Sequence, residues 1–229
     1  EFTLKNMRRP TDDQPFTNYS LDEVITTGAQ QFDWASRRKT TPGSDEGPIK
    51  RGSGFSFMMF RAGVGTSSAI VRVDAQRQYT LFVGVTDIGP GAKTTMGMIA
   101  AEELGVPLDQ VEVVAGDTDR CPYSVGESGS RTTIQTGYAV MQAAKDLNQQ
   151  IADSGMPTGS DVLIASATPN PSTDGKTRQC FGAHFVEVEV DTRIGTTRIV
   201  KYTTVHESGR IINPTTARDQ IRGATLQGI

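Results

Sequence analysis

Apolar positions recur with two different periods along this chain, and the change of period divides it into predicted elements. Between residues 21 and 38 the apolar positions lie three and four apart, which predicts a helix with Ser20 as its N-cap. From residue 55 onward they form short or alternating runs, which predict strands over 55–60, 68–73 and 79–85. A helix over 94–104, a strand over 111–114 and a long helix over 132–151 follow.

The second half of the chain begins with a loose segment and ends in regular elements. Residues 153–180 are rich in Gly, Pro, Ser, Thr and Asp, with one strand-like stretch at 161–165. The alternating stretches 185–190 and 197–205 predict a β-hairpin, and Asn213 with Pro214 suits the cap and first turn of a final helix. We therefore predict an α+β fold with mixed sheets and packed helices.

These elements predict four consecutive parts. Residues 1–53 are expected to be an N-terminal connector with a helix, and residues 54–152 a first α+β subdomain. Residues 153–180 are expected to be a loop-rich linker, and residues 181–229 the hairpin and helix of an incomplete second subdomain. Small residues in the long helix predict close packing against a neighbour: Gly137, Ala139, Ala143 and Ala144.

Two glycine-rich turns each precede a predicted helix. They read Asp87-Ile88-Gly89-Pro90-Gly91 and Gly126-Glu127-Ser128-Gly129-Ser130-Arg131-Thr132-Thr133; residues 129–133, next to the helix, are the second turn proper. Unpaired N–H groups and the helix dipole attract anions at such a place, so both turns are candidate sites for a phosphate or pyrophosphate. Arg131 and Lys93 can add positive charge, and Arg131 can bind a phosphate through two N–H groups. In the alternative interpretation the turns only redirect the chain, and Ser130 is simply a helix N-cap.

Charge and hydropathy exclude several classes of function. The net charge of −3 is small and both signs are interspersed, which disfavours binding of nucleic acid. The apolar runs are too short for a membrane span. The two cysteines, Cys121 and Cys180, cannot form a disulfide framework or hold an iron–sulfur cluster, and we expect reduced, partly buried thiols.

The remaining titratable groups give no recognisable site. His184 and His206 fall in different predicted strands, where they are expected to be core or edge groups and not metal ligands. Asp117, Asp119 and Glu127 are expected to order loops, because Asp-Thr-Asp is common in turns. No metal ligand is therefore predicted.

Seven segments, in this order along the chain, resemble the molybdopterin-binding subunit of the xanthine dehydrogenase and aldehyde oxidoreductase family. They are residues 85–89, 99–107, 116–119, 129–133, 185–191, 209–214 and 220–223. The subunits of that family are much longer, and this chain begins at Glu1 without a starting Met. The resemblance therefore implies an internal fragment, with a small self-contained protein as the alternative.

The resemblance implies a molybdenum cofactor held by the dithiolene of molybdopterin, with the cytosine dinucleotide as one form. A metal held in this way needs no protein ligands. The residues implied to contact the cofactor are Ile88, Gly89, Pro90, Gly91, Gly129, Ser130, Arg131, Thr132, Thr133 and Gln220. Related enzymes often carry Gln where this chain has Pro90, and proline cannot donate a hydrogen bond. The family's catalytic glutamate belongs to a Gly-Glu motif that would lie beyond the last residue, so no catalytic residue is assigned.

The activity implied is oxidation of an aldehyde, or hydroxylation of an N-heteroaromatic or purine carbon, with water as the oxygen source. The implied partners are the rest of the subunit, iron–sulfur and flavin or cytochrome electron-transfer subunits that hold [2Fe-2S] and FAD, and a small-molecule substrate. A cytoplasmic location is expected, with the periplasm as the alternative, and the fragment alone is expected to be inactive.

Two other functions stay open at this point. One is a cofactor-free structural or assembly segment of such a complex. The other is a nucleotide-binding enzyme, although neither a P-loop nor a complete dinucleotide fingerprint occurs.

Overall fold

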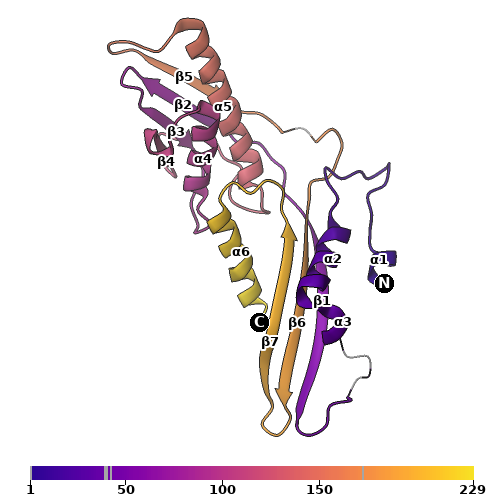
Figure 1. The fold of residues 1–229 in the computed structure, drawn as a ribbon. Helices are drawn as coiled ribbons and strands as arrows, with labels where there is room; N and C mark the ends of the chain where they lie inside the picture. Colours follow the sequence, from indigo (N-terminus) through magenta and orange to yellow (C-terminus); the bar gives the residue numbers. More distant parts are fainter. Residues whose placement is uncertain (1, 39–40, 42, 172) are drawn as a thin grey trace. The chain divides into compact units, whose positions relative to one another are not determined.

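The computed structural model describes residues 2–38, 41, 43–171 and 173–229, and the chain forms two compact units. Unit 1 comprises Glu1–Arg61 and Thr173–Gly209, and unit 2 comprises Ala62–Ser172 and Arg210–Ile229. Each unit has its own sheet (Figure 1). Each also has its own hydrophobic core. The predicted α+β class with mixed helices and sheets is confirmed.

Unit 1 is built on a three-stranded antiparallel sheet in the order β1-β6-β7. The strands are β1 (Ile49–Arg61), β6 (Gln179–Asp191) and β7 (Thr196–Glu207). Helix α2 (Leu21–Phe32) packs on one face of this sheet, and the short helices α1 (Phe2–Asn6) and α3 (Trp34–Arg37) belong to the same unit. The hairpin predicted from the alternating stretches is confirmed as β6 and β7.

Aromatic rings form the core of unit 1 around Phe185, which is 1% exposed. The Phe185 ring stacks on Phe55 with centroids 5.4 Å apart, and it lies 5.7 Å from both Phe32 and Trp34. A Cβ added at Gly28 would lie 2.4 Å from this ring, so glycine is what lets α2 approach the sheet. The core thus joins α2, α3 and two strands of the sheet.

Two local predictions in unit 1 are wrong. The helix predicted over 21–38 is interrupted at Asp33, whose φ of 62° is left-handed. Ser20 does hold the N-cap position, as predicted, although its side chain makes no cap hydrogen bond. Strand β1 begins at Ile49, inside the predicted connector. Its first residues are polar and glycine-rich, so they carry no alternating pattern, yet they pair with β6 from Asp191 onward.

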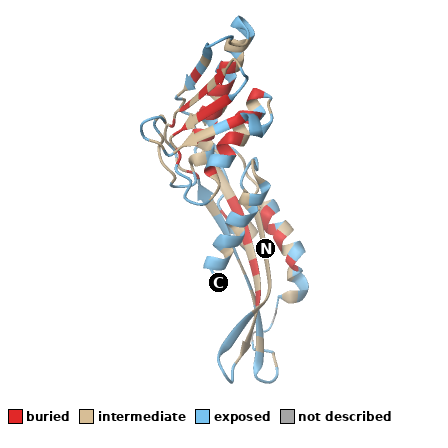
Figure 2. Cartoon of the chain, turned by 90° about the vertical axis from the view of Figure 1, so that its left-hand side faces the viewer, coloured by how far each residue is buried: buried red, intermediate tan, exposed pale blue. Residues whose placement is uncertain are grey.

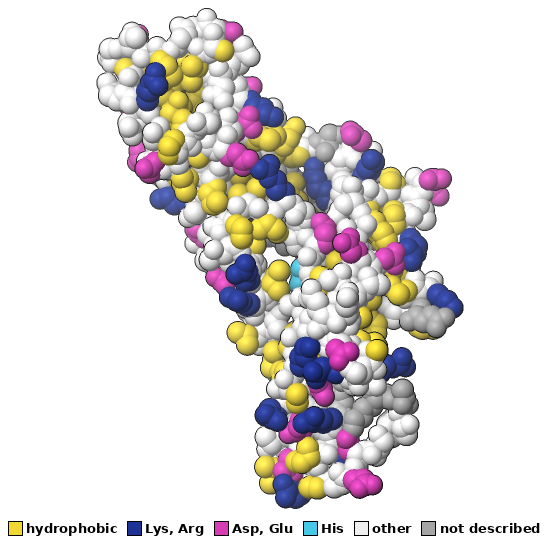
Figure 3. All heavy atoms as spheres, viewed as in Figure 1, with side chains coloured by type: hydrophobic (Ala, Val, Ile, Leu, Met, Phe, Trp, Pro, Cys, Tyr) yellow, Lys and Arg dark blue, Asp and Glu magenta, His cyan; other side chains and the backbone are white. Residues whose placement is uncertain are grey.

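Ion pairs connect neighbouring strands at the far end of this sheet. Glu189 binds both Arg51 of β1 and Arg198 of β7, at 2.8 and 3.1 Å. Asp191 instead binds Arg193, in the turn between β6 and β7, at 2.7 Å. Figure 3 shows side chains of both charges gathered around this end of the sheet. Exposed pairs of this kind each contribute little to stability, so their main effect is on strand register.

Unit 2 is built on a four-stranded sheet in the order β4-β3-β2-β5. The strands are β2 (Ala69–Asp74), β3 (Tyr79–Val83), β4 (Val111–Ala115) and β5 (Val162–Ala167). Strands β3 and β4 are parallel and are joined through α4 (Ala92–Leu104) and the 3₁₀ turn η1 (Leu108–Gln110). Helices α5 (Thr132–Ser154) and α6 (Pro214–Gln227) complete the unit. Figure 2 shows the buried residues of this sheet and of the helices against it.

Helices α4 and α5 pack closely, as the small residues of the long helix predicted. Ala139, Ala143 and Ala144 are fully buried, and a Cβ added at Gly137 would lie 2.8 Å from the Ile99 side chain. The contact lets both helices cover the sheet, where β2 alternates buried and half-buried positions. Helix α5 is therefore held in place by a well-packed core.

The division into units differs from the predicted order of four consecutive parts. Residues 54–61 belong to β1 and pair with β6, which lies more than a hundred residues later. The predicted linker 153–180 contains β5, which pairs with β2, and the final helix belongs to unit 2. These pairings are far apart in sequence, so local composition does not reveal them.

Candidate functional site

Both glycine-rich turns lie at one edge of the sheet of unit 2. The first turn connects β3 to α4, and the second follows β4 on the way to α5. Because β3 and β4 are parallel neighbours, their carboxyl ends meet at the same edge. In open α/β sheets this edge is where ligands bind.

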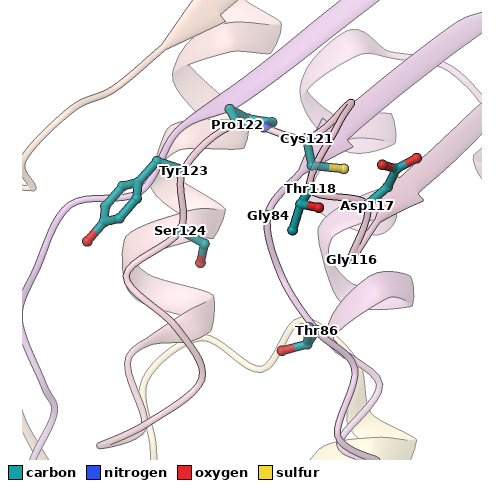
Figure 4. A pocket seen from close by; sticks show the side chains of 9 residues that line it. All are labelled: Gly84, Thr86, Gly116, Asp117, Thr118, Cys121, Pro122, Tyr123 and Ser124. Atoms are coloured by element: carbon teal, nitrogen blue, oxygen red, sulfur yellow. The ribbon is translucent and has the colours of Figure 1, made fainter.

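A cavity of about 260 Å³ lies beside these carboxyl ends (Figure 4). It is lined by Gly84 and Thr86, which follow β3, and by residues that follow β4: Gly116, Asp117, Thr118, Cys121, Pro122, Tyr123 and Ser124. A Cβ added at Gly84 would lie 2.3 Å from the carbonyl oxygen of Pro122, so glycine allows the two segments to touch. The walls are mostly backbone and small polar side chains.

A direct hydrogen bond links the two glycine-rich segments. The hydroxyl of Thr86, just before the first turn, donates to Oε2 of Glu127, just before the second. The other oxygen of Glu127 is buried and has no hydrogen-bond partner within the described part of the chain. Glu127 therefore orders the loops, as the sequence predicted, and leaves one acceptor unsatisfied.

In the first turn, the side chain of Asp87 already accepts hydrogen bonds from the turn's own N–H groups. The Asp87 carboxylate accepts hydrogen bonds from the backbone N–H groups of Gly89, Gly91 and Lys93, at 3.0 to 3.2 Å. Burial alone would raise the pKa of Asp87, but these N–H groups and that of Ala92 outweigh it and lower the pKa. The prediction that both turns offer free N–H groups to an anion is therefore wrong for this turn.

Replacing Asp87 with alanine is expected to lower the free energy of unfolding by about 1 kcal/mol at pH 7, the usual cost of losing a cap. The folded-state pKa is lowered, so this contribution is present above the unfolded-state pKa of about 4 and is lost as pH falls through the folded-state pKa. Urea unfolding at pH 7 and pH 3 measures both effects. Asp109→Ala, at an exposed position, is the control. A gap between the variant and the original protein that is equally large at pH 3 would contradict this role.

Other residues of the first turn face outward. Ile88 is 73% exposed, Gly89 is exposed and Pro90 is partly buried. A Cβ added at Gly91 would lie 3.1 Å from the Thr216 side chain of α6, so this turn lies against the start of that helix. What the turn presents outward is therefore apolar surface and backbone.

The second turn leaves its helix end open. Gly129 and Ser130 both have left-handed φ values, of 60° and 56°. The cap position of α5 is Arg131, which makes no side-chain cap hydrogen bond, so the alternative that Ser130 is the N-cap is wrong. Within the described ranges, no side-chain oxygen accepts from the first turn of α5. Thr133 is exposed there and Thr132 is partly buried.

Arg131 points back into the protein. Its Nη2 donates to the carbonyl of Val125 at 2.7 Å, its Nη1 to that of Val64 at 3.1 Å, and its Nε to that of Gly126 at 3.3 Å. The sequence predicted that the Arg131 guanidinium would bind a phosphate through two N–H groups. Three of the five N–H groups of this side chain instead hold backbone carbonyls.

Gln220 lies on α6, one helical turn after Thr216, and is exposed. Positions four apart share a helix face, so Gln220 lies on the face that meets the first turn through Thr216. The side chain of Asn213 caps α6 by accepting from Thr215 and Thr216, at 3.1 and 3.3 Å, which confirms the predicted cap.

The two histidines lie in β6 and β7 of unit 1, as predicted. His184 Nε2 lies 3.1 Å from His206 Nε2, and His184 Nδ1 lies 3.0 Å from the hydroxyl of Tyr202. Burial lowers the pKa of both imidazoles, and His184 lowers that of His206 further. Within the described ranges, no group of three His, Cys, Asp or Glu side chains could hold a metal ion.

This pair is expected to make unit 1 less stable in mild acid. Both pKa values are lowered by folding, so below the unfolded-state pKa of about 6.5 the unfolded chain binds protons more readily and stability falls. Urea unfolding at pH 7.5 and 5.5, followed by the fluorescence of Trp34, should show a smaller loss in His184→Gln than in the original protein. Equal losses in both proteins would contradict this origin.

Sequence reasoning missed the residues of the cavity, including Gly84, Thr86 and Ser124. The available signal was the predicted order of strand, helix and strand over 79–114, which is typical of parallel neighbours with a shared carboxyl edge. This signal points to the residues just after each of the two strands as candidates for lining a ligand site.

Comparison with known proteins finds a matching family and related subunits. The family described as a molybdopterin cofactor-binding domain matches residues 27–159 and 158–229. The molybdenum-binding subunit PaoC of an aldehyde oxidoreductase from Escherichia coli is 30% identical over 93% of this chain and 33% of its own length. The gamma subunit of the 6-hydroxypseudooxynicotine dehydrogenase complex of Paenarthrobacter nicotinovorans is 29% identical over 79% of this chain and 28% of its own length.

A solved structure shares the fold. CO dehydrogenase from Oligotropha carboxidovorans superposes with a TM-score of 0.83 and 21% identity, over 96% of this chain and 35% of that one. The chain spans about a third of the length of the curated relatives it matches. None of the helices in the described ranges is long and apolar enough to cross a membrane.

Proposed function

Because the chain belongs to the molybdopterin cofactor-binding domain family, we propose that the turn before α5 binds the anionic end of the pterin cofactor. The observation that carries this proposal is the contrast between the two turns. Asp87 occupies the N–H groups before α4, whereas none of the side chains that the structure describes does so before α5. A helix N-terminus left open in this way is suited to a phosphate group.

The donor set fits such a group. Backbone N–H groups at the start of α5 can donate to phosphate oxygens, and the hydroxyls of Ser130, Thr132 and Thr133 can add further hydrogen bonds. Gly129 has a left-handed φ of 60°, which favours glycine at the point where the turn leads into α5. We propose Gly129, Ser130, Thr132 and Thr133 as the main contacts of the second turn.

The first turn plays a different part in this proposal. Ile88, Gly89, Pro90 and Gly91 supply apolar and backbone surface to the pterin rings, without an anion site of their own. Gln220 adds an amide from the face of α6 that meets this turn. Because Pro90 has no donor, any polar contact in this turn comes from the outward backbone.

When bound, the molybdenum pterin supplies the redox chemistry, and the protein supplies binding and orientation. The residues of this chain hold the cofactor at the carboxyl edge of β3 and β4, where the bridge from Thr86 to Glu127 fixes the spacing of the two turns. No residue here is proposed as the catalytic base. A glutamate elsewhere in the longer protein is proposed for that role.

For the whole protein we propose oxidation of an aldehyde, or hydroxylation of an N-heteroaromatic or purine carbon, with oxygen from water. Relatives named as an aldehyde oxidoreductase subunit, a probable hypoxanthine oxidase and a nicotine 6-hydroxylase large subunit support this proposal. The proposed partners are the rest of the subunit and iron–sulfur and flavin or cytochrome subunits. These subunits would carry [2Fe-2S] and FAD, and the complex is proposed to be cytoplasmic or periplasmic.

The test is to purify the complex that contains this chain and to measure its molybdenum, its released pterin and its oxidation of aldehydes and N-heteroaromatic compounds. We expect close to one molybdenum and one pterin for each chain, with turnover of at least one substrate class. An intact complex without pterin would overturn the proposal and favour a structural segment. Oxidation of neither class by a loaded complex would overturn only the proposed substrates.

A further inference from the structure

We infer that Arg131 is a positioning residue, whose guanidinium fastens the second turn to residues 62–68 instead of binding the cofactor's anionic group. This inference rests on the proposed function only in naming what the turn is positioned for. The fastening itself is a property of the protein without cofactor. It concerns the one cationic side chain that the sequence placed in this turn.

The guanidinium spans three points of the surrounding backbone. Val125 and Gly126 lie on the approach to the turn, and Val64 lies on the segment that follows β1. One planar group thus ties the approach to the turn to the chain beside it. A charged donor makes stronger hydrogen bonds to carbonyls than a neutral one, so this contact is a strong local constraint.

The segment beside the turn is adapted to this contact. The N–H of Gly63 donates to the carbonyl of Gly129 at 2.7 Å, and the side-chain amide of Gln135 donates to the carbonyl of Gly63 at 3.4 Å. A Cβ added at Gly63 would lie 3.1 Å from the Gly129 oxygen and 3.2 Å from Arg131 Cδ. A side chain at Gly63 would therefore push Arg131 and Gly129 away.

Further along, the two segments stay paired. The N–H of Ser68 donates to the carbonyl of Tyr123 at 2.8 Å, and the N–H of Val125 donates to the hydroxyl of Ser67 at 3.2 Å. Ser67 is fully buried. Hydrogen bonds thus join the approach to the turn to the neighbouring segment along its length, and the contacts of Arg131 complete this set at the point where α5 begins.

The test uses the complex that contains this chain, made in cells that cannot synthesise the pterin, and measures hydrogen exchange. Arg131→Gln and Arg131→Lys are both expected to speed exchange of the Gly63 amide and of residues 124–131 roughly tenfold or more. Lysine keeps the charge but cannot span three carbonyls, so it should not rescue the effect. Lys93→Gln, which removes a cation at the other turn, should leave this exchange unchanged.

A second variant guards against a general loss of folding. Gly63→Ala changes no charge, and it should speed exchange in the same residues, with a less than multiplicative effect when combined with Arg131→Gln. Hydrogen exchange inside α5, at Ala143 and Leu147, should stay slow in all variants. In the complex made with pterin, the Arg131 variants should contain less pterin even though α5 remains fully protected from exchange.

Unchanged exchange at residues 63 and 124–131 in the cofactor-free Arg131 variants would overturn the inference. Combined with loss of pterin, that result would show that Arg131 binds the cofactor directly. The exchange result stands whether or not the complex binds pterin, so a failure of the proposed function would be seen separately.

Discussion

Replacing Phe185 with alanine is expected to lower the free energy of unfolding of unit 1 by about 3–5 kcal/mol, the usual cost of removing a buried phenylalanine. Phe185 is 1% exposed, and its ring contacts those of Phe32, Trp34 and Phe55. Its loss would leave a cavity that α2 cannot fill without moving toward the sheet. Few single changes in this unit should cost more.

Tryptophan fluorescence can follow the unfolding of unit 1, because the single tryptophan of the chain is Trp34, whose ring lies 5.7 Å from that of Phe185. Urea unfolding followed by tryptophan fluorescence measures the stability of unit 1. Phe2→Ala is the control, since Phe2 is 79% exposed and its loss should change stability little. A cost below about 1 kcal/mol for Phe185→Ala would contradict the central place of this ring.

Replacing Thr133 with aspartate is expected to lower the amount of pterin bound to the complex roughly tenfold or more, while the fold stays intact. Thr133 is the exposed second residue of α5. A carboxylate there would repel an anionic group and compete for the same N–H groups. The same carboxylate interacts favourably with the helix dipole, which should stabilise the protein by about 0.3–1 kcal/mol.

Lower pterin binding together with higher stability would distinguish loss of the anion site from loss of folding. The pterin released from the complex measures binding, and thermal unfolding of the cofactor-free complex measures stability. Thr196→Asp, at an exposed threonine of unit 1, is the matched control and should retain the pterin. Full pterin content in Thr133→Asp would rule out the start of α5 as the anion site.

The sequence was a good guide to the fold where apolar residues carry a period. The strands β2 and β3 and the helices α4 and α5 were predicted within a few residues, because one face of each packs on a core. The start of β1 was missed, since its glycines and charged residues are stabilised by pairing with β6. The break at Asp33 was missed because a left-handed residue leaves the apolar spacing almost unchanged.

For the site, the sequence identified the right segments but not the roles of their side chains. Both glycine turns precede helices, as predicted, and the structure places both at the carboxyl edge of parallel strands. The sequence could not show that Asp87 folds back onto its own turn or that Arg131 donates to the carbonyl of Val64, 67 residues earlier. Such contacts depend on tertiary geometry, which spacing along the chain does not contain.

The most direct test of this account is an experimental structure of the pterin-loaded complex. We predict a phosphate oxygen within hydrogen-bond distance of the backbone N–H groups at Thr132 and Thr133, with Asp87 still bound to Gly89 and Gly91 in the first turn. A phosphate bound instead at the start of α4, with Asp87 displaced, would contradict the account.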